Sequence, residues 1–364
     1  MKKIVTIVGA RPQFVKAAVL SRLIRTEKWK DKFTEILVHT GQHYDQNMSE
    51  VFFSDMEIPK PDYNLNIGSG SHGKMTGHML IEIEKLLLHE KPDLVLVYGD
   101  TNSTLAGALA ASKLHISLAH VEAGLRSFWK QMPEEQNRIL TDHISDYLFC
   151  PTETAVNNLK KEGITEGVYN VGDIMLDANL FYRDKMQKEK EKGIDRLKRI
   201  NELKLETLQE NFILATVHRA ENTDDIEKLK NIIDAFNIID IDIILPLHPR
   251  TRKILSENDF KLNSNIKIID PVGYFEMIEL EQKCKCIITD SGGVQKEAYF
   301  MKKPCITLRE QTEWVETVDS GWNVLVGTNK TKIANSVASL KTPSTYPELY
   351  GRGDSASSIL DTFT

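Results

Sequence analysis

The stretch LVLVYGDTNSTLAGALAASKLHISLAH, Leu94–His120, contains one copy of the structural unit that the rest of the chain repeats. Leu94–Tyr98 is a short run of Val and Leu, typical of a buried strand, and Ser117–His120 is a second apolar run. Between them, Ser103–Ser112 is rich in alanine, which favours a helix that packs closely on a sheet. Strand, helix and strand in this order predict a parallel βαβ unit.

The same alternation continues through both halves of the sequence. The strands predicted in the first half are Ile4–Val8, Glu35–His39, Leu94–Tyr98, Ser117–His120 and Asp146–Cys150. Those predicted in the second half are Phe212–Val217, Ile241–Leu247, Ile266–Ile269, Cys286–Thr289, Cys305–Thr307 and Asn323–Val326. The pattern predicts an α/β protein with two Rossmann-like, doubly wound domains.

Two segments between the halves bear on the domain boundary. Gly172–Asp173, after the strand-like Val168–Val171, is where we expect the chain to cross, which gives domains of residues 1–172 and 173–345. Arg183–Glu210 is highly charged, with Leu and Ile at helical spacing. We interpret that segment as the solvated flank of a helix, although an interaction arm has the same composition.

The overall composition excludes several classes of protein. The 364 residues include 46 Lys and Arg against 52 Asp and Glu, a net charge of −6, which argues against nucleic acid as the main partner. The four cysteines include no Cys-x-x-Cys pair, so reduced thiols are expected. The apolar run after Lys2-Lys3 is too short for a signal peptide or a membrane span, which favours a soluble cytoplasmic protein without a membrane partner. His39 and His43 flank a glycine and give no helical metal site, so no metal is expected.

Two predicted strand-to-helix turns have the residues of an anion site. Arg11-Pro12 begins the first helix and Lys16 follows one turn later, so free amides and two cations would attract a pyrophosphate. A pair of basic surface residues explains the same sequence equally well. Ser291-Gly292-Gly293 follows a strand in the second half, and glycines allow the backbone to approach phosphate closely. Its alternative is a simple helix cap, and we favour the anion site.

Acidic side chains follow neighbouring strands of the first half. Asp100 and Glu122 each end a strand, and Glu134 comes shortly afterwards. Carboxylates crowded into one cleft repel each other and lose solvent, which raises at least one pKa toward a range useful in acid–base catalysis. Either of the first two could instead cap a helix, and Glu135 with Arg138 could form a simple intrahelical pair.

A histidine follows the first predicted strand of the second half. His218 is next to Arg219, with Glu221 and Asn222 close behind. A histidine at a strand end could donate to a phosphate or exchange a proton near neutral pH. A structural role is the alternative.

Together these motifs resemble those of one enzyme family. The motifs are Gly9-Ala-Arg11-Pro12 with Lys16, Gly41-Gln42-His43, Gly99-Asp100-Thr101, His120-Val-Glu122-Ala-Gly-Leu-Arg126, Pro133-Glu134-Glu135 with Asn137-Arg138, Pro151-Thr152-Glu153, His218-Arg219 with Glu221-Asn222, and Thr289-Asp290-Ser291-Gly292-Gly293. In this order they resemble the non-hydrolysing UDP-N-acetylglucosamine (UDP-GlcNAc) 2-epimerases, from about Ile4 to Asp354.

The resemblance implies both a fold and an activity. The fold is glycosyltransferase-B-like, with two domains facing a cleft and the last helix, about residues 346–364, returning to the first domain. The activity is reversible conversion of UDP-GlcNAc to UDP-N-acetylmannosamine (UDP-ManNAc) by elimination to 2-acetamidoglucal and re-addition, without NAD or metal. A hydrolysing epimerase, a UDP-sugar glycosyltransferase and a non-catalytic UDP-sugar sensor are the alternatives. A homodimer is also implied.

The resemblance assigns roles to particular positions. The implied catalytic residues are Asp100, Glu122, Glu134 and His218, and the implied UDP contacts are Arg11, Lys16, Ser291, Gly292, Gly293 and Glu297. Gln42, His43 and His248 match a regulatory site at which UDP-GlcNAc activates the enzyme. Trp314 stands where many members have a nucleotide-contacting arginine, and Arg309 is the candidate replacement.

Overall fold

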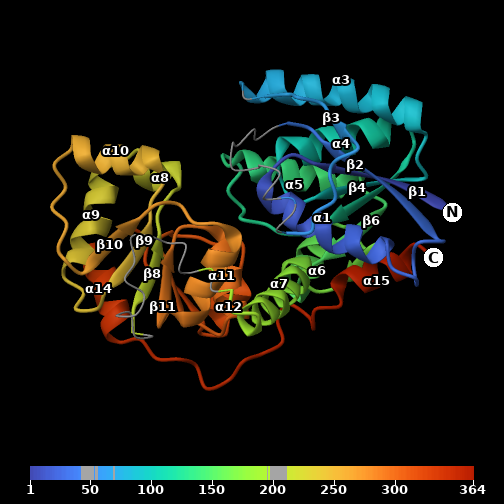
Figure 1. Ribbon diagram of the computed structural model, residues 1–364. Helices are drawn as coiled ribbons and strands as arrows, with labels where there is room; N and C mark the ends of the chain where they lie inside the picture. The colour runs from blue at the N-terminus through green and yellow to red at the C-terminus, as the bar shows by residue number, and fades with distance from the viewer. Residues whose placement is uncertain (42–52, 54–55, 69, 195, 197–210) are drawn as a thin grey trace. The chain divides into compact units, whose positions relative to one another are not determined.

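The computed structural model describes residues 1–41, 53, 56–68, 70–194, 196 and 211–364 (Figure 1). The chain divides into two compact units. Unit 1 comprises residues 1–180 and 348–364, and unit 2 comprises residues 181–347. The first division between them falls inside helix α7 (Ile174–Glu191).

Unit 1 is built on a seven-stranded sheet in the order β3-β2-β1-β4-β5-β6-β7, and every pairing is parallel. Its strands are β1 (Lys2–Val8), β2 (Phe33–His39), β3 (Tyr63–Asn64), β4 (Leu94–Tyr98), β5 (Ser117–Val121), β6 (Tyr147–Cys150) and β7 (Val168–Asn170). Its helices are α1 (Arg11–Ile24), α3 (His72–Glu90), α4 (Asn102–Lys113), α5 (Pro133–Ile144), α6 (Glu153–Lys161), the start of α7 and α15 (Ser355–Thr362).

Helices cover both faces of this sheet. Helices α3 and α4 pack their apolar side chains on one face, where Met79 and Ile83 meet the strand residues Val95 and Val97. Figure 1 shows α1, α6 and α15 on the opposite face. The C-terminal segment completes unit 1, because α15 packs against α1 and the Asp173 amide donates to the carbonyl of Tyr350 at 2.9 Å.

Unit 2 repeats the architecture with a six-stranded parallel sheet in the order β10-β9-β8-β11-β12-β13. Its strands are β8 (Ile213–Thr216), β9 (Ile243–Pro246), β10 (Ile266–Ile269), β11 (Cys286–Thr289), β12 (Cys305–Thr307) and β13 (Asn323–Leu325). Its helices are the rest of α7, α8 (Ala220–Thr223), α9 (Ile226–Asn237), α10 (Pro249–Glu257), α11 (Tyr274–Lys283), α12 (Gly292–Phe300), α13 (Val315–Asp319) and α14 (Lys330–Ala338). Helices α9, α10 and α14 bury one face of the sheet, and α11 and α12 bury the other.

The predicted fold class is confirmed, and four predicted strands match the structure residue for residue: β4, β10, β11 and β12. Each is a short, mainly apolar run, which is buried along its length in β4, β11 and β12 and at both ends in β10. The two-residue strand β3 was not predicted. In the charged segment, α7 runs to Glu191, and most of the segment beyond that lies outside the described residues.

The strand orders also show where a ligand would be expected. In open parallel sheets, ligands bind at the carboxyl ends of the strands where the strand order reverses. In unit 1 that reversal lies between β1 and β4, and in unit 2 it lies between β8 and β11. The predicted site residues at positions 11, 16 and 100 follow the first pair, and those at positions 218 and 291–293 follow the second.

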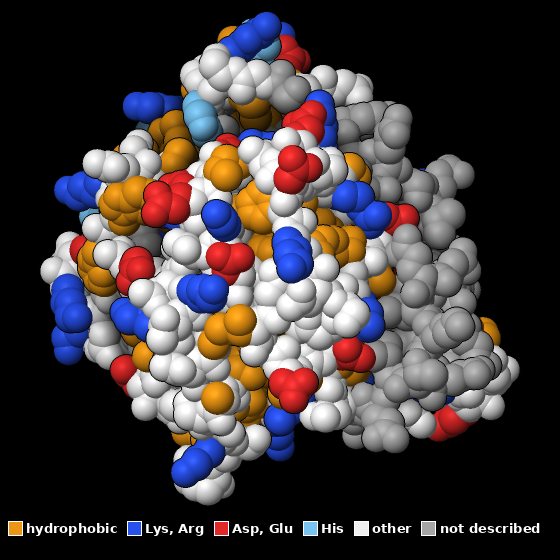
Figure 2. Space-filling view, turned by 90° about the vertical axis from the view of Figure 1, so that its left-hand side faces the viewer, with side chains coloured by type: hydrophobic (Ala, Val, Ile, Leu, Met, Phe, Trp, Pro, Cys, Tyr) orange, Lys and Arg blue, Asp and Glu red, His pale blue; other side chains and the backbone are white. Residues whose placement is uncertain are grey.

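Charged side chains of both signs are interspersed across the face that Figure 2 shows. Exposed ion pairs on α10 include Arg250 with Asp224 and Arg252 with Asp270, at 2.5 and 2.8 Å. All four cysteines are buried free thiols. Among the described helices, none combines the length and the apolar character that crossing a bilayer requires.

Candidate active site

Three acidic side chains gather where β4, β5 and α5 come together in unit 1. Asp100 follows β4, Glu122 follows β5 and Glu134 lies in the first turn of α5. The charges of Glu122, Glu134 and Lys16 all act on the Asp100 carboxyl group, so these three side chains lie within electrostatic range of it. The structure therefore brings together the three carboxylates that the sequence singled out.

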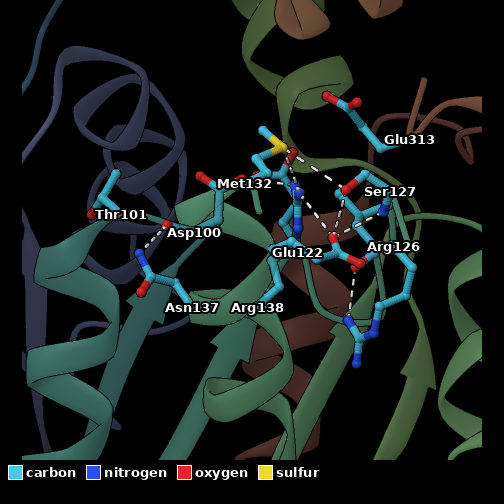
Figure 3. A network of polar contacts seen from close by, with 12 residues as sticks. Asp100, Thr101, Glu122, Arg126, Ser127, Met132, Asn137, Arg138 and Glu313 are labelled. Carbon is cyan, nitrogen blue, oxygen red and sulfur yellow. Dashed lines mark hydrogen bonds and ion pairs between the residues drawn. The ribbon is translucent and has the colours of Figure 1, made fainter. Parts of the chain in front are cut away.

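Two residues of α5 hold Asp100 in place, as Figure 3 shows. The guanidinium of Arg138 lies 2.9 Å from Asp100 Oδ2, and the Asn137 amide donates to the Asp100 carbonyl at 2.8 Å. Burial raises the pKa of Asp100 above its usual value and Glu122 adds to the rise, although Arg138 opposes it. The helix-cap interpretation of Asp100 is wrong, because Thr101 caps α4 and its Oγ1 accepts from the Thr104 amide.

Glu122 has an unusual backbone conformation and a buried partner. Its φ of +75° lies in the left-handed region, which is costly for a residue with a side chain. Its carboxylate forms an ion pair with Lys16, and both side chains are buried. Gly99 makes room for the pair, because a Cβ at that position would lie 3.3 Å from Glu122 Oε2 and 3.6 Å from Lys16 Nζ.

Helix α5 also supports the loop that follows Glu122. Glu135 and Arg138 form the predicted intrahelical pair at 3.1 Å, and the same Glu135 carboxylate accepts from the backbone amides of Ser127 and Phe128 at 2.9 and 2.8 Å. Phe128 has a φ of +59° and its side chain is 74% exposed. Glu135 thus links the loop to Arg138, and Arg138 links it to Asp100.

The turn before α1 is organised differently from the predicted anion site. Gln13 Oε1 accepts from the amides of Gly9 and Ala10 at 2.8 and 3.0 Å, so these two donors are engaged within the protein. Gln13 also donates to the carbonyl of Tyr98 at 2.6 Å, which joins the ends of β1 and β4. Arg11 is the first residue of α1, whereas Lys16 is turned toward Glu122.

In unit 2, Asp290 organises the turn that contains His218. This fully buried carboxylate accepts from the backbone amides of His218 and Arg219 at 3.1 and 3.0 Å, and from the Asn222 side chain at 3.1 Å. His218 Nδ1 lies 3.7 Å from Asp290, and the His218 side chain is exposed. Asp290 itself was not among the predicted site residues.

The start of α12 has the helix cap that was the alternative interpretation of this turn, and a carboxylate lies close to its first glycine. Ser291 is the N-cap and its Oγ accepts from the Val294 amide at 3.4 Å. Gly292 is buried, and a Cβ there would come within 2.4 Å of Glu313 Oε1, so any larger residue would have to displace that carboxylate. Gly293 is exposed, and Glu297 lies further along the same helix, where it interacts with the buried Glu281.

The Trp314 position is filled by a packed pair rather than by an exposed cation. The Trp314 ring is buried, and Lys296 Nζ lies 4.0 Å from its centroid, a cation–π contact. Arg309, the candidate replacement for the missing arginine, is buried and pairs with Glu313 at 3.1 Å. Lys296 belongs to α12 itself, and Glu313, the partner of Arg309, borders Gly292 in the first turn of that helix.

Of the three predicted regulatory residues, the structure describes only His248. Gln42 and His43 lie outside the described residues. His248 is the exposed N-cap of α10, and its Nδ1 accepts from the Arg250 amide at 3.2 Å. Over the described part of the chain, no group of three or more His, Cys, Asp or Glu side chains is placed to hold a metal ion.

Comparison with known proteins gives consistent matches along the whole chain. A family model described as UDP-N-acetylglucosamine 2-epimerase matches residues 26–364. The chain is 58% identical to a Methanococcus maripaludis protein named UDP-N-acetylglucosamine 2-epimerase homolog, covering 99% of this chain and 98% of that protein. It is 53% identical, with the same coverages, to the Pseudomonas aeruginosa UDP-2,3-diacetamido-2,3-dideoxy-D-glucuronate 2-epimerase.

Solved structures give the same result. The Methanocaldococcus jannaschii UDP-GlcNAc 2-epimerase in complex with UDP-GlcNAc and UDP superimposes with a TM-score of 0.87 at 47% identity, covering 100% of this chain and 99% of that one. The calicheamicin glycosyltransferase CalG4, at 11% identity and a TM-score of 0.54, shares the fold alone. The resemblance to UDP-GlcNAc 2-epimerases drawn from the sequence motifs is confirmed.

Proposed function

This chain belongs to the UDP-N-acetylglucosamine 2-epimerase family, and from that premise we propose that it reversibly epimerises C2 of UDP-GlcNAc to give UDP-ManNAc. The observation that carries the proposal is the group formed by Asp100 and Glu122, at the ends of β4 and β5, with Glu134 in the first turn of α5. Inversion at a carbon needs a proton removed from one face and returned to the other. Two proton-handling groups suit that task better than one.

The chemistry follows from the poor acidity of the C2 proton. A free carbanion at C2 would form too slowly, so the C1–O bond to UDP breaks as a base takes the proton. The electron pair of that bond leaves with the UDP β-phosphate, and a C1–C2 double bond remains, giving 2-acetamidoglucal. UDP then adds back to C1 while C2 is protonated from the opposite face. The two reaction steps together are redox-neutral and consume no water.

We assign the reacting groups to the two units as follows. Asp100, Glu122 and Glu134 handle the proton, and His218 stabilises or protonates the departing phosphate. UDP is bound by Arg11, Lys16, Ser291, Gly292, Gly293, Glu297 and Arg309. Fixed amides and cations at these positions stabilise the charge that develops on the pyrophosphate. Exclusion of water from the glucal is what separates this reaction from hydrolysis.

One experiment separates the candidate activities. The purified protein is incubated with UDP-GlcNAc in D₂O, without added metal or acceptor, and followed by proton NMR. Deuterium at C2 with formation of UDP-ManNAc supports the non-hydrolysing epimerase. Free ManNAc indicates the hydrolysing enzyme, turnover only with an acceptor indicates a glycosyltransferase, and an unchanged spectrum indicates a sensor.

A second substrate is favoured by one specific observation. The chain is 53% identical over 99% of its length to an enzyme whose name gives a diacetamido uronic acid as its substrate. That sugar also has a 2-acetamido group beside the UDP-bearing carbon, so the same elimination applies. Comparing kcat/KM for the two UDP-sugars decides between them, since the true substrate is expected to give the higher value by at least about tenfold, or 1.4 kcal/mol.

Two further features of the proposal concern assembly and control. We propose a homodimer, which light scattering on the purified protein tests directly. We also propose that UDP-GlcNAc activates the enzyme through Gln42, His43 and His248. Turnover of UDP-ManNAc alone should then start slowly and accelerate when a small amount of UDP-GlcNAc is added.

A further inference from the structure

Behind the acidic cluster, one buried carboxylate is bonded to both ends of the turn that carries Glu122. Asp142 on α5 accepts from His120 Nδ1 at 2.7 Å, before Glu122 in the chain. After Glu122, it accepts from the Gly124 amide at 3.1 Å and from Arg126 Nη1 at 2.7 Å. The left-handed backbone at Glu122 is thus fixed from both sides by a single side chain.

His120 extends this arrangement to the neighbouring strand. Its ring is fully buried, and its second nitrogen, Nε2, lies 2.7 Å from the carbonyl oxygen of Gly99. A carboxylate faces one ring nitrogen and a carbonyl faces the other, so both nitrogens must donate, and the ring is an imidazolium. It therefore ties Asp142 to the peptide that immediately precedes Asp100.

The charges around this pair are balanced. Arg126 also forms two bonds with Glu162, at 2.7 and 2.8 Å, so two cations and two anions alternate in the network. Burial tends to raise the pKa of Asp142, but the adjacent His120 and Arg126 outweigh it and keep that pKa below its usual value. Asp142 is therefore ionised and able to accept all of these bonds.

We propose that Asp142 and His120 are positioning residues that hold Glu122 and Asp100 in their reactive geometry, an inference that rests on the proposed epimerase activity. Neither side chain need touch the substrate. Gly99 and Glu122 both have positive φ, at +61° and +75°, and such conformations persist only when their surroundings determine them. The Asp142–His120 pair supplies that constraint to both residues at once.

Two substitutions separate the two bonds of His120. In His120→Gln the amide nitrogen can replace Nε2 as the donor to Gly99, whereas in His120→Asn it can replace Nδ1 as the donor to Asp142. Misplacing a reacting group by about 1 Å can cost about 100-fold in rate. We expect kcat to fall about 100-fold in His120→Asn and about tenfold in His120→Gln, with KM changed less than threefold in both.

A matched control and two independent measurements complete the test. Asp146 accepts from the Leu118 amide at 2.8 Å, at the opposite end of β5, so Asp146→Asn should leave kcat unchanged. Asp142→Asn should lower kcat at least as much as His120→Asn. This variant tests the positioning role if the histidine variants fail to fold. Melting temperature and the Kd for UDP are measured for each variant. Unchanged kcat in both histidine variants, equal losses in the two, or losses that simply follow melting temperature would overturn the inference.

Failure of the proposed function gives a different result. Wild-type protein that turns over neither UDP-sugar contradicts the epimerase assignment itself. The Asp142–His120 pair can then still be tested by nitrogen-15 NMR of histidine-labelled protein near neutral pH, because both ring nitrogens of His120 should be protonated. A neutral ring there would contradict the positioning role regardless of activity.

Discussion

Lys16 and Glu122 form a buried ion pair in unit 1, with side chains only 11% and 8% exposed. The ammonium group therefore lies beside one of the carboxylates proposed to handle the C2 proton. Removing one member of such a pair leaves a buried charge without its counter-ion. The cation expected to meet the pyrophosphate thus also stabilises an anion of the catalytic group.

Substituting Lys16→Met should damage both stability and activity. Breaking a buried ion pair costs about 3 to 5 kcal/mol, so the melting temperature should drop clearly and turnover should fall at least 100-fold. The double variant Lys16→Met with Glu122→Gln removes both charges and should recover most of the stability but none of the activity. Calorimetry and the NMR assay measure the two effects. A double variant as unstable as the single one would contradict the pairing.

The glycine beside this pair should not tolerate a side chain. Gly99 has a φ of +61°, and a Cβ there would lie 3.3 Å from Glu122 Oε2. Gly99→Ala should therefore destabilise unit 1 by about 1 to 2 kcal/mol and lower kcat by displacing Glu122. Gly163→Ala, at a φ of +83° with nothing near its Cβ, is the matched control. It should lose similar stability and keep full activity, whereas equal kcat losses in both variants would refute a local effect.

The acidic limb of the pH profile should reflect Asp100. Burial raises its pKa, so the fall in kcat/KM at low pH should occur above the ordinary Asp value of about 4. Arg138 opposes that rise, and Arg138→Gln removes a cation that favours the ionised form. The limb should therefore move to higher pH in this variant.

The amide variants control for this assignment. Asp100→Asn, Glu122→Gln and Glu134→Gln should each slow deuterium exchange at C2 strongly at every pH. A limb that keeps its wild-type midpoint in Arg138→Gln would show that another group controls it. Wild-type exchange in all three amide variants would remove the carboxylates from the mechanism.

In unit 2, Asp290 should be essential for the His218 turn. Asp290→Asn replaces an acceptor of several N–H donors with an amide that must also donate, and breaking such a buried network costs about 3 kcal/mol. UDP affinity, measured by calorimetry, should fall as well, because Ser291 follows directly. Asp225→Asn alters the exposed cap of α9 and should cost less than about 0.5 kcal/mol without changing UDP affinity, since asparagine caps helices about as well as aspartate. Unchanged UDP binding in Asp290→Asn would contradict its role.

A buried carboxyl group in unit 1 should make stability depend on pH. Burial raises the pKa of Asp177 to about 6, although its carboxylate accepts from the Ala356 amide at 2.9 Å. The folded state therefore binds an extra proton between pH about 4, the unfolded value, and pH 6. Stability should fall as pH rises through this window, by at most about 3 kcal/mol, and then level off.

The variant Asp177→Asn tests that dependence. The asparagine cannot ionise, so the melting temperature of this variant should not show the Asp177-dependent loss between pH 4 and pH 6. The drop in melting temperature from pH 4 to a pH above 6 should therefore be smaller in the variant than in the wild type. Asp173→Asn, on the same segment, is the comparison, and there Asp173 Oδ1 accepts from the Met175 amide at 2.8 Å. A wild-type pH profile in Asp177→Asn would assign the effect to another group.

The features that could be predicted from the sequence are those encoded within one continuous segment of the chain. Strands such as Leu94–Tyr98 matched because an uninterrupted apolar run has a single stable location, inside a sheet covered on both faces. Asp100 and Glu122 were also predictable, since the end of a parallel strand is the place where ligands meet an α/β sheet. Strand β3 was missed because two residues carry no periodic pattern.

The supporting residues could not be predicted in the same way. Asp142 lies on the buried side of helix α5 with no motif to distinguish it, and its partner His120 lies on strand β5. The hydrogen bond from the Gly9 amide to Gln13 Oε1 likewise depends on a side-chain conformation that is set by the tertiary structure. These contacts are tertiary, so no spacing within one segment encodes them.

The return of the C-terminal segment to unit 1 has a consequence for the order of synthesis. Helix α15 packs against α1, and the segment beginning at residue 348 belongs to the same compact unit as the first strands. On the ribosome, unit 2 emerges whole while unit 1 still lacks its last helix. The amino-terminal half, although made first, can reach its final form only after residues 348–364 have left the exit tunnel.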